Sequence, residues 1–218
     1  MLKLRLKSLV KYIDKTDKII DIGCDHALLD VYLIKNKLTN QLIVSDIHEG
    51  ALANGVTNIK RNHLSKKIDA RLGNGLEVLK PSDDINTILL SGMGSSTILS
   101  ILDNPYLDKI DKLILQSNND HYELRRQIIA KGFYVASEEY FIDSKKNYIN
   151  IVFKRGYKKY SKKEMRYGPI LIHDQNYLTF ELNNCLHIKR LIPGDKFLLN
   201  YRLDREIKLL NKLIKNIK

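Results

Sequence analysis

The segment that decides the fold is Lys18–Ala27, which reads KIIDIGCDHA. It opens with a short run rich in isoleucine, too short for a helix, which is typical of a buried strand. Gly23 follows the run, and a residue without a Cβ lets the chain turn sharply and lets a ligand approach the backbone. The segment therefore predicts a strand that ends at a binding loop.

The same pattern of a short apolar run and a turn recurs along the chain, with amphipathic segments between the runs. This alternation predicts an α/β open sheet of parallel strands joined by helices. The expected strands are Lys18–Asp21, Leu42–Ser45, Ile68–Arg71, Thr87–Leu90 and Leu113–Leu115, and the expected helices include Ala27–Lys37, Glu49–His63 and Tyr122–Lys131.

Two more strands are expected near Phe133–Tyr140 and Tyr148–Phe153, with no long helix between them. They predict an antiparallel hairpin at one edge of the sheet. Seven strands that end in such a hairpin are typical of the Rossmann-like class I methyltransferase fold, whereas a dinucleotide-binding domain usually stays parallel. A full G-x-G-x-x-G is also missing from the first loop, which argues against NAD.

The character of the chain changes after Arg155. A basic, tyrosine-bearing stretch at 154–167 reads as a solvated linker or as a contact with RNA phosphates. Two apolar stripes follow, separated by Pro193-Gly194-Asp195, and the second has the spacing of a coiled-coil seam. We therefore expect a catalytic domain at residues 1–155 and a helical, coiled-coil hairpin domain at residues 156–218.

Composition limits the classes of function. Hydrophobic residues make up 44% of the 218, and no apolar run approaches the ~20 residues of a membrane span. The amino-terminal segment lacks the pattern of a signal peptide, so we expect a cytoplasmic protein, and we expect a monomer. The two cysteines, Cys24 and Cys185, have no partners at metal-ligand spacing, so no metal is expected. A net charge of +12 favours a polyanionic partner, although an AT-rich genome can also enrich lysine.

Three successive strand ends carry groups that suit S-adenosylmethionine. Asp21 ends the first strand, where a carboxylate suits the cationic methionine part. Asp46, 23 residues after Gly23, can accept both ribose hydroxyls. Asn74, between Gly73 and Gly75, can bind an adenine edge. The loops Ser91–Ser96 and Gln116–Asn119 end the fourth and fifth strands on the same rim.

These loops resemble those of the bacterial tRNA (adenine(22)-N1)-methyltransferases, whose sequences read DIGSDHAYLP, GMGG and LQPN at the corresponding places. Here the strings are DIGCDHALLD from Asp21, GMGS from Gly92 and LQSN from Leu115. The Gly-Pro at Gly168 also matches the family's entry to its helical tail, so the resemblance covers nearly the whole chain. The departures are Cys24 for Ser, Asp30 for Pro, Ser95 for Gly and Ser117 for Pro.

The resemblance implies methyl transfer from S-adenosylmethionine to N1 of an adenine in the tRNA D-arm. N1 of neutral adenine carries a free lone pair, and a carboxylate that accepts from the N6 amino group stabilises the cationic product. Asp25 is the candidate for that role, with His26 to orient it or take a proton and Asn118 to hold the base edge. The residues expected at the cofactor are Asp21, Gly23, Asp46, Ile47, Gly73, Asn74, Gly75, Ser91, Gly92 and Met93.

Each assignment has an alternative. Asp25 can cap the following helix, His26 can be a structural histidine, and Gly92 and Gly94 can serve close packing of strand and helix. The chain can also act on another RNA or a small molecule, or it can be a non-catalytic nucleic-acid-binding module.

Overall fold

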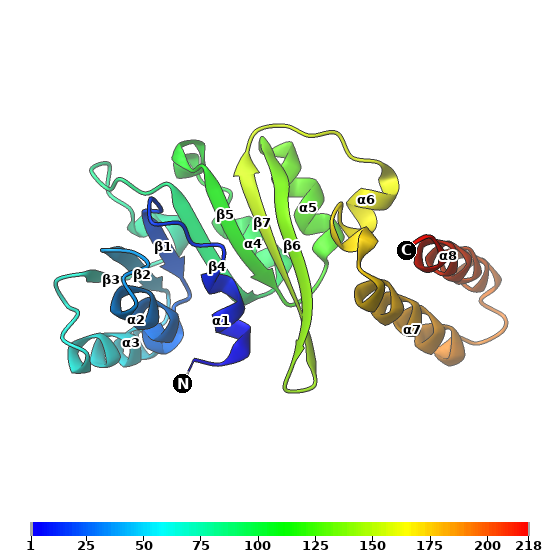
Figure 1. Ribbon diagram of the computed structural model, residues 1–218, viewed down its shortest axis with the longest axis horizontal. Coiled ribbons are helices and arrows are strands. Elements are labelled where there is room, and N and C mark those ends of the chain that lie inside the picture. Colours follow the sequence, from blue (N-terminus) through cyan, green and yellow to red (C-terminus); the bar gives the residue numbers. More distant parts are fainter. Residues whose placement is uncertain (1, 218) are drawn as a thin grey trace.

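The computed structural model describes residues 2–217 and contains one seven-stranded sheet in the order β3-β2-β1-β4-β5-β7-β6. Strands β1 to β5 pair in parallel, and β7 pairs antiparallel with both β5 and β6 (Figure 1). The expected antiparallel hairpin at one edge is therefore confirmed. The strands are β1 (Ile19–Ile22), β2 (Leu42–Asp46), β3 (Ile68–Leu72), β4 (Thr87–Met93), β5 (Lys112–Ser117), β6 (Phe133–Asp143) and β7 (Lys146–Arg155).

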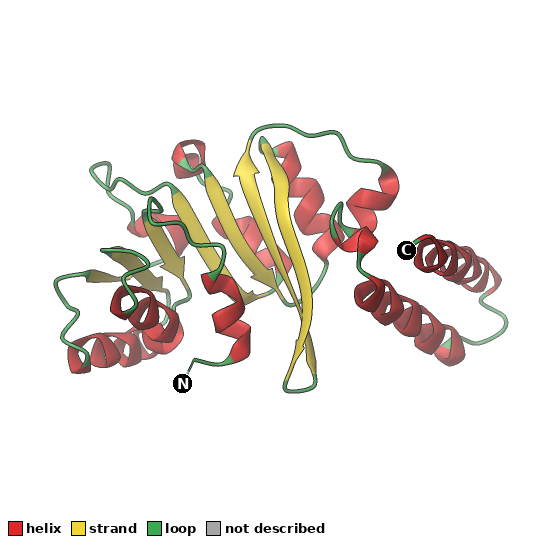
Figure 2. Ribbon diagram, in the orientation of Figure 1, coloured by secondary structure: helices red, strands yellow, loops and turns green. Residues whose placement is uncertain are grey.

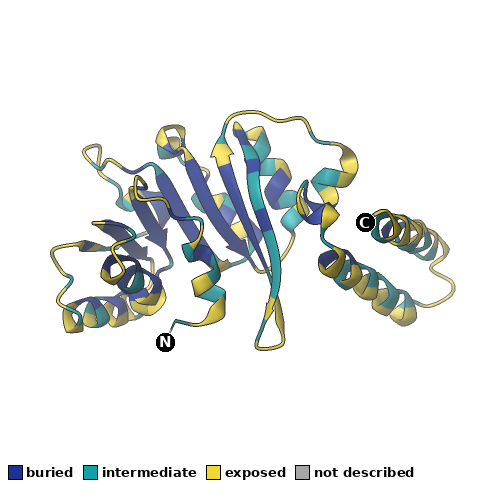
Figure 3. Cartoon of the chain, in the orientation of Figure 1, coloured by how far each residue is buried: buried dark blue, intermediate teal, exposed yellow. Residues whose placement is uncertain are grey.

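Helices cover both faces of this sheet (Figure 2). Helices α1 (Leu4–Val10), α2 (Leu28–Lys35) and α3 (Glu49–Arg61) contribute to one core, and α4 (Ser95–Ile101) and α5 (His121–Ala130) contribute to the other. The strands divide their side chains accordingly: Ile20 and Ile22 enter the core of α4 and α5, whereas Ile19 enters the core of α2 and α3. Asp21 therefore faces the α2 side, since successive residues of a strand point to opposite faces. Strands β1, β2 and β5 are buried along their whole length, and β4 is buried except for its last three residues (Figure 3).

The predicted helices are present, with shorter bounds at α2 because a 3-10 turn, η1 (Asp25–Ala27), precedes it. Sequence analysis did not predict α1 or α4. Three further 3-10 segments, η2 (Gly75–Val78), η3 (Pro105–Lys109) and η4 (Leu171–His173), lie in the connections. Among residues 2–217, no helix combines the length and the apolar character needed to cross a membrane.

The carboxyl-terminal part is a helical hairpin of α7 (Gln175–Leu191) and α8 (Phe197–Asn216), as predicted, and the two helices break at Pro193-Gly194-Asp195. It extends away from the sheet (Figure 1). The stretch before it is more ordered than a solvated linker: α6 (Lys162–Tyr167) starts with a capping box of Ser161 and Glu164. The Tyr160 hydroxyl contacts both backbone groups of Val135.

A buried ion pair attaches the helical hairpin to the sheet. Arg125 of α5 and Glu138 of β6 are both inaccessible to solvent, and their Nε and Oε1 atoms lie 2.6 Å apart. The other Glu138 oxygen accepts from the backbone N–H groups of Ile170 and Leu171, at 3.0 and 3.3 Å. Arg125 also donates to the carbonyl of Arg166. The carboxylate thus joins the sheet to the segment that leads into α7.

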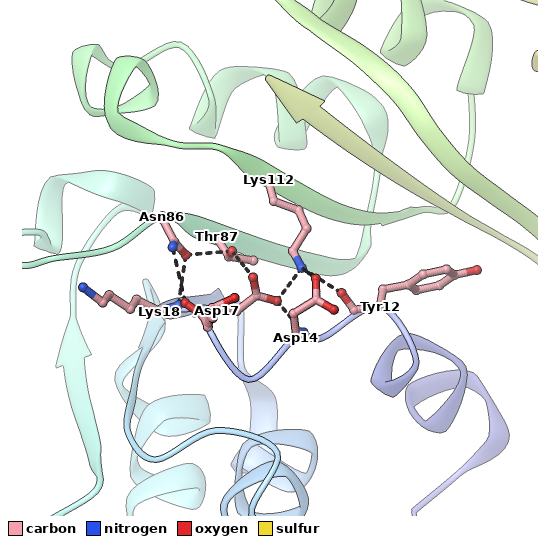
Figure 4. A network of polar contacts seen from close by, with 8 residues as sticks. Tyr12, Asp14, Asp17, Lys18, Asn86, Thr87 and Lys112 are labelled. Atoms are coloured by element: carbon pink, nitrogen blue, oxygen red, sulfur yellow. Dashed lines mark hydrogen bonds and ion pairs between the residues drawn. The ribbon is translucent and has the colours of Figure 1, made fainter. Parts of the chain in front are cut away.

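A second buried charge, that of Lys112, lies at the end of the sheet where the parallel strands begin (Figure 4). The Lys112 ammonium contacts the carboxylates of Asp17 at 2.5 Å and Asp14 at 2.8 Å, and it donates to the Tyr12 carbonyl at 3.0 Å. Asp17 also accepts from the hydroxyl of Thr87. This network fastens the segment between α1 and β1 to strands β4 and β5. The hydrogen bond from Lys112 lowers the pKa of Asp14.

We predict that Lys112→Met lowers the free energy of unfolding by about 3 kcal/mol, because it leaves the buried Asp17 carboxylate without its partner. Urea unfolding of the full chain measures this value. Lys131→Met removes a lysine that pairs with the exposed Asp103, so it is the matched control and should cost less than about 1 kcal/mol. Equal effects of the two variants would contradict a structural role for the buried network.

Candidate active site

A cavity of about 960 Å³ opens where β1, β2 and β4 end. The loops after these strands, the loop after β3, helix α4 and the amino-terminal segment line it. Eleven of the residues predicted from the sequence line this one cavity, namely Asp21, Gly23, Asp25, His26, Asp46, Ile47, Asn74, Gly75, Ser91, Gly92 and Met93. Gly73 and Asn118 are not among the lining residues, but each is hydrogen-bonded to a neighbour that is.

The loop after β1 depends on Gly23. Its φ of +76° lies in the left-handed region, and its N–H donates to the Ser45 carbonyl at 2.8 Å. A Cβ at this position would lie 2.1 Å from the Met93 Cε atom. The turn therefore favours a glycine, and a side chain here would also have to displace the end of Met93.

Asp25 and His26 lie at the exposed rim of the cavity. The Asp25 side chain is 72% exposed, and its Oδ1 atom lies 3.5 Å from Nε2 of His26. His26 and Ala27 both have positive φ values, a strained backbone for residues with a Cβ, and Asn58 donates to the His26 carbonyl. This turn presents the side chains of Asp25 and His26 to solvent rather than to the core.

The alternatives for Asp25 and His26 are not supported by this geometry. Neither η1 nor α2 has a side-chain hydrogen bond at its amino-terminal cap, so the expectation that Asp25 could cap the helix is wrong. The reason is the left-handed turn, which makes Ala27 the residue that precedes α2. The His26 side chain is half exposed, and Asp25 is its one acidic partner among residues 2–217. His26 is therefore not a buried structural histidine.

The carboxylate of Asp46 is oriented by its own loop. One of its oxygens accepts from the His48 N–H at 2.9 Å, which leaves the other oxygen available at the cavity. Gly73 supports the same residue from the next strand, because its N–H donates to the Asp46 carbonyl at 3.0 Å. Asn74 is exposed beside it and contacts only Glu77 through its side chain, at 3.3 Å.

The last residues of β4 contain a register shift. Pairing with β5 is interrupted between Ser91 and Met93, and Gly92 at the shift has a φ of +80°. The Asn118 side-chain amide donates to the Gly92 carbonyl at 2.8 Å, so the fifth-strand loop holds the fourth. Asn119 adds a second link by accepting from the Ser95 N–H.

Arg5 of α1 is a site residue that sequence analysis missed. Its guanidinium donates to the Gln116 side chain at 3.0 Å and lines the cavity. A Cβ on Gly92 would lie 3.2 Å from Arg5 Nη1. Gly92 therefore leaves room for the Arg5 side chain, rather than for close packing of a helix against the strand. No strand-end pattern marks Arg5, since α1 precedes the first strand and reaches the site only through tertiary packing.

The charges of the cavity are mostly negative and partly buried. Burial, and after it the neighbouring carboxylate of Asp30, raises the pKa of Asp21 well above its ordinary value, while Arg5 opposes this effect. Burial also raises the pKa of Asp30 to about 7. Asp21, Asp25 and Asp46 at the cavity carry the carboxyl groups that can bind a cation when they are ionised. Within residues 2–217, no three His, Cys, Asp or Glu side chains gather in a way that could hold a metal ion.

Comparison with known proteins agrees with the predicted family and fold. The family model described as TrmK, tRNA (adenine(22)-N(1))-methyltransferase, matches residues 19–217. The tRNA (adenine(22)-N(1))-methyltransferase of Bacillus subtilis (strain 168) is 29% identical over 154 residues, which are 70% of this chain and 64% of that protein. The chain thus spans somewhat less than two thirds of that relative's length in the alignment.

Solved structures match over almost the full chain. The M. capricolum TrmK in complex with S-adenosyl-homocysteine has a TM-score of 0.86 and 28% identity, with 100% of both chains covered. The B. subtilis m1A22 tRNA methyltransferase TrmK has a TM-score of 0.83 and 26% identity, with 98% of this chain and 99% of that chain covered. Both the predicted family and the predicted class I methyltransferase fold are confirmed. The chain belongs to the tRNA (adenine(22)-N(1))-methyltransferase family.

Proposed function

We propose that this chain transfers the methyl group of S-adenosylmethionine to N1 of adenine 22 in tRNA. The observation that carries the proposal is the gathering of Asp21, Asp46 and Asn74 from three strand ends in one cavity, beside the Gly92 loop. Membership of the family supports the same reaction, and the related M. capricolum protein holds S-adenosyl-homocysteine, the product of such a transfer.

The polar groups of the cavity fit the cofactor. The unengaged oxygen of Asp46 suits the ribose hydroxyls, the buried Asp21 suits the methionine ammonium, and Asn74 suits the adenine edge. Ile47, Gly75, Ser91 and Met93 complete the lining, and Gly73 supports Asp46 from behind. When bound, S-adenosylmethionine supplies a methyl group on a positively charged sulfur, which is open to attack by a nitrogen lone pair.

The residues at the rim are placed to act on the target base. We assign to Asp25 the acceptance of a hydrogen bond from the adenine N6 amino group, which stabilises the positive charge that develops on the base. His26, 3.5 Å from it, orients that carboxylate or takes the proton afterwards. Asn118 uses its amide N–H to hold Gly92, so its carbonyl oxygen remains for the base edge. Alignment of the methyl group with N1 supplies much of the acceleration.

We assign tRNA contact to the unit at residues 156–218 and catalysis to residues 1–155. The tip of the hairpin exposes aromatic rings next to cations: Phe197 is 82% exposed, and Arg205 lies 6.0 Å from the Tyr201 ring centre. Arg202 and Arg205 line a cavity between the helices and have no ion-pair partner among residues 2–217. Exposed rings and arginines are the groups that stack on bases and bind phosphates.

Other functions are less well supported. The basic hairpin disfavours a small-molecule substrate, and the intact carboxylates and glycines of the cavity disfavour a non-catalytic module. Only the family match argues against another RNA as the substrate. A tRNA substrate implies that the protein acts in the cytoplasm. We also propose that it acts as a monomer, because the residues of one chain are sufficient to form the cavity.

Asp46→Asn should weaken the binding of S-adenosyl-homocysteine about 10- to 100-fold, because the ribose loses a charged acceptor. Isothermal calorimetry on the full chain measures the dissociation constant. The matched control is Asp108→Asn, an exposed aspartate of η3 outside the cavity, which should bind as the unchanged protein does. Undiminished binding by the Asp46 variant would refute the ribose assignment.

Asp25→Asn should slow methylation of tRNA about 100-fold under single-turnover conditions, because the amide stabilises the developing cation poorly. The affinity for S-adenosyl-homocysteine should stay the same, which separates chemistry from cofactor binding. An unchanged single-turnover rate would remove Asp25 from the catalytic residues.

The double variant Arg202→Ala/Arg205→Ala should weaken tRNA binding at least about tenfold and reduce the slope of log affinity against log salt by about 2. Filter binding over a range of salt concentrations measures both values in the full chain. Truncation is unsuitable, since Tyr167, Leu171 and Leu178 belong to the core against the sheet. The control is Lys66→Ala/Lys67→Ala, which removes the same charge at another cavity. An equal loss of tRNA affinity in this control would contradict a specific role of the hairpin in tRNA binding.

A further inference from the structure

Asp30 is a buried acid that the reaction described above does not use. It lies in the first turn of α2, is 1% exposed, and does not line the cavity. Among residues 2–217, no N–H or O–H group donates a hydrogen bond to either of its carboxylate oxygens. An isolated carboxylate in such a place is costly, so the position requires a proton or a cation.

The neighbour of Asp30 is Asp21, the carboxylate that faces the cavity. Asp21 is 5% exposed on β1, and its carboxyl group and that of Asp30 are close enough for each to shift the pKa of the other. Two carboxylates in contact cannot both be ionised in a buried place, so a proton between them satisfies both. The pair then presents a single negative charge toward the cavity.

The other charged and titratable groups around the pair come from three elements. Arg5 of α1 favours ionisation of Asp21, whereas Asp46 at the end of β2 opposes it. Cys24 lies in the turn after β1, and burial with the nearby carboxylates raises the pKa of its thiol, so it stays uncharged. One cation, Arg5, thus acts against three carboxylates, those of Asp21, Asp30 and Asp46. The Asp21–Asp30 pair is therefore the group that gains or loses a proton.

We propose that Asp21 and Asp30 bind the ammonium group of the cofactor as one carboxyl pair, and that Asp30, acting through Asp21, couples cofactor binding to proton release. Asp30 is a positioning residue, since it does not touch the cavity. In the uncharged pair each carboxyl holds its proton. Binding of the ammonium group favours the singly ionised pair, so one O–H bond breaks and its proton passes to solvent. This inference rests on the proposed cofactor.

The direction of the pH effect follows from the raised pKa of the pair. Burial raises the pKa of Asp30 to about 7, so the free pair is uncharged well below that pH and singly charged above it. The affinity for a ligand with an ammonium group should therefore increase about tenfold from about pH 6 to about pH 8. The pair also affects folding. Its proton stabilises the folded state below the ordinary pKa of aspartate, and this stabilisation is lost as the pH rises through about 7.

The test compares the full chain with Asp30→Asn by calorimetry with S-adenosyl-homocysteine, in buffers of different ionisation enthalpy so that released protons are counted. The unchanged protein should release close to one proton at about pH 6 and bind about tenfold more weakly there than at about pH 8. Asp30→Asn should release fewer protons than the unchanged protein and should bind more tightly than it does at about pH 6, because the variant lacks the carboxylate that, after burial, raises the pKa of Asp21. Proton release from every other group is common to both proteins, so the difference reports the pair.

Two controls keep the outcomes distinct. Methylthioadenosine lacks the ammonium group, so its binding should show no difference between the two proteins. Urea unfolding without ligand should show that Asp30→Asn loses less stability than the unchanged protein between about pH 5 and about pH 8, whereas Asp108→Asn should follow the unchanged protein. Identical proton release and pH profiles for the two proteins would overturn the inference, and failure of both to bind S-adenosyl-homocysteine at any pH would overturn the proposed function instead.

Discussion

Burial of the parallel strands on both faces is the constraint on which the rest of this molecule depends. With helices on each side, strands β1, β2, β4 and β5 can carry apolar side chains along their length and polar ones only where they end or where a partner is buried with them. Parallel strands end at the same edge, so the polar side chains of separate strands meet there. The cavity and its carboxylates follow from this arrangement.

The two buried ion networks hold this arrangement from opposite sides. Lys112 with Asp14 and Asp17 fixes the segment that carries α1, and α1 delivers Arg5 to the cavity at the other edge. Arg125 with Glu138 fixes the segment that leads into the helical hairpin. Neither network lies in the site, yet the first fixes the helix that brings Arg5 to it and the second joins the helical hairpin to the sheet.

The sequence was sufficient for those parts of the site that follow from local rules. Asp21, Asp46 and Asn74 could be predicted because each follows a recognisable strand, and the hairpin could be predicted from two stripes and a Pro-Gly break. Arg5 could not, because only packing of α1 against the sheet brings it near Gly92. The surroundings of Asp25 could not either, since the positive φ values of His26 and Ala27 have no signature in residues that carry a Cβ. The contact between Asp21 and Asp30 required the placement of α2 on the correct face.

The attachment of the hairpin at its base has a consequence for how the family can diversify. Tyr177 and Leu178, at the start of α7, are buried against the sheet, whereas Leu191 and Phe197 near the tip are exposed. A helix rises ~1.5 Å per residue, so seven residues added to each arm would move the tip outward by ~10 Å and leave the catalytic edge untouched. The length of the hairpin can therefore change independently of the chemistry at the sheet.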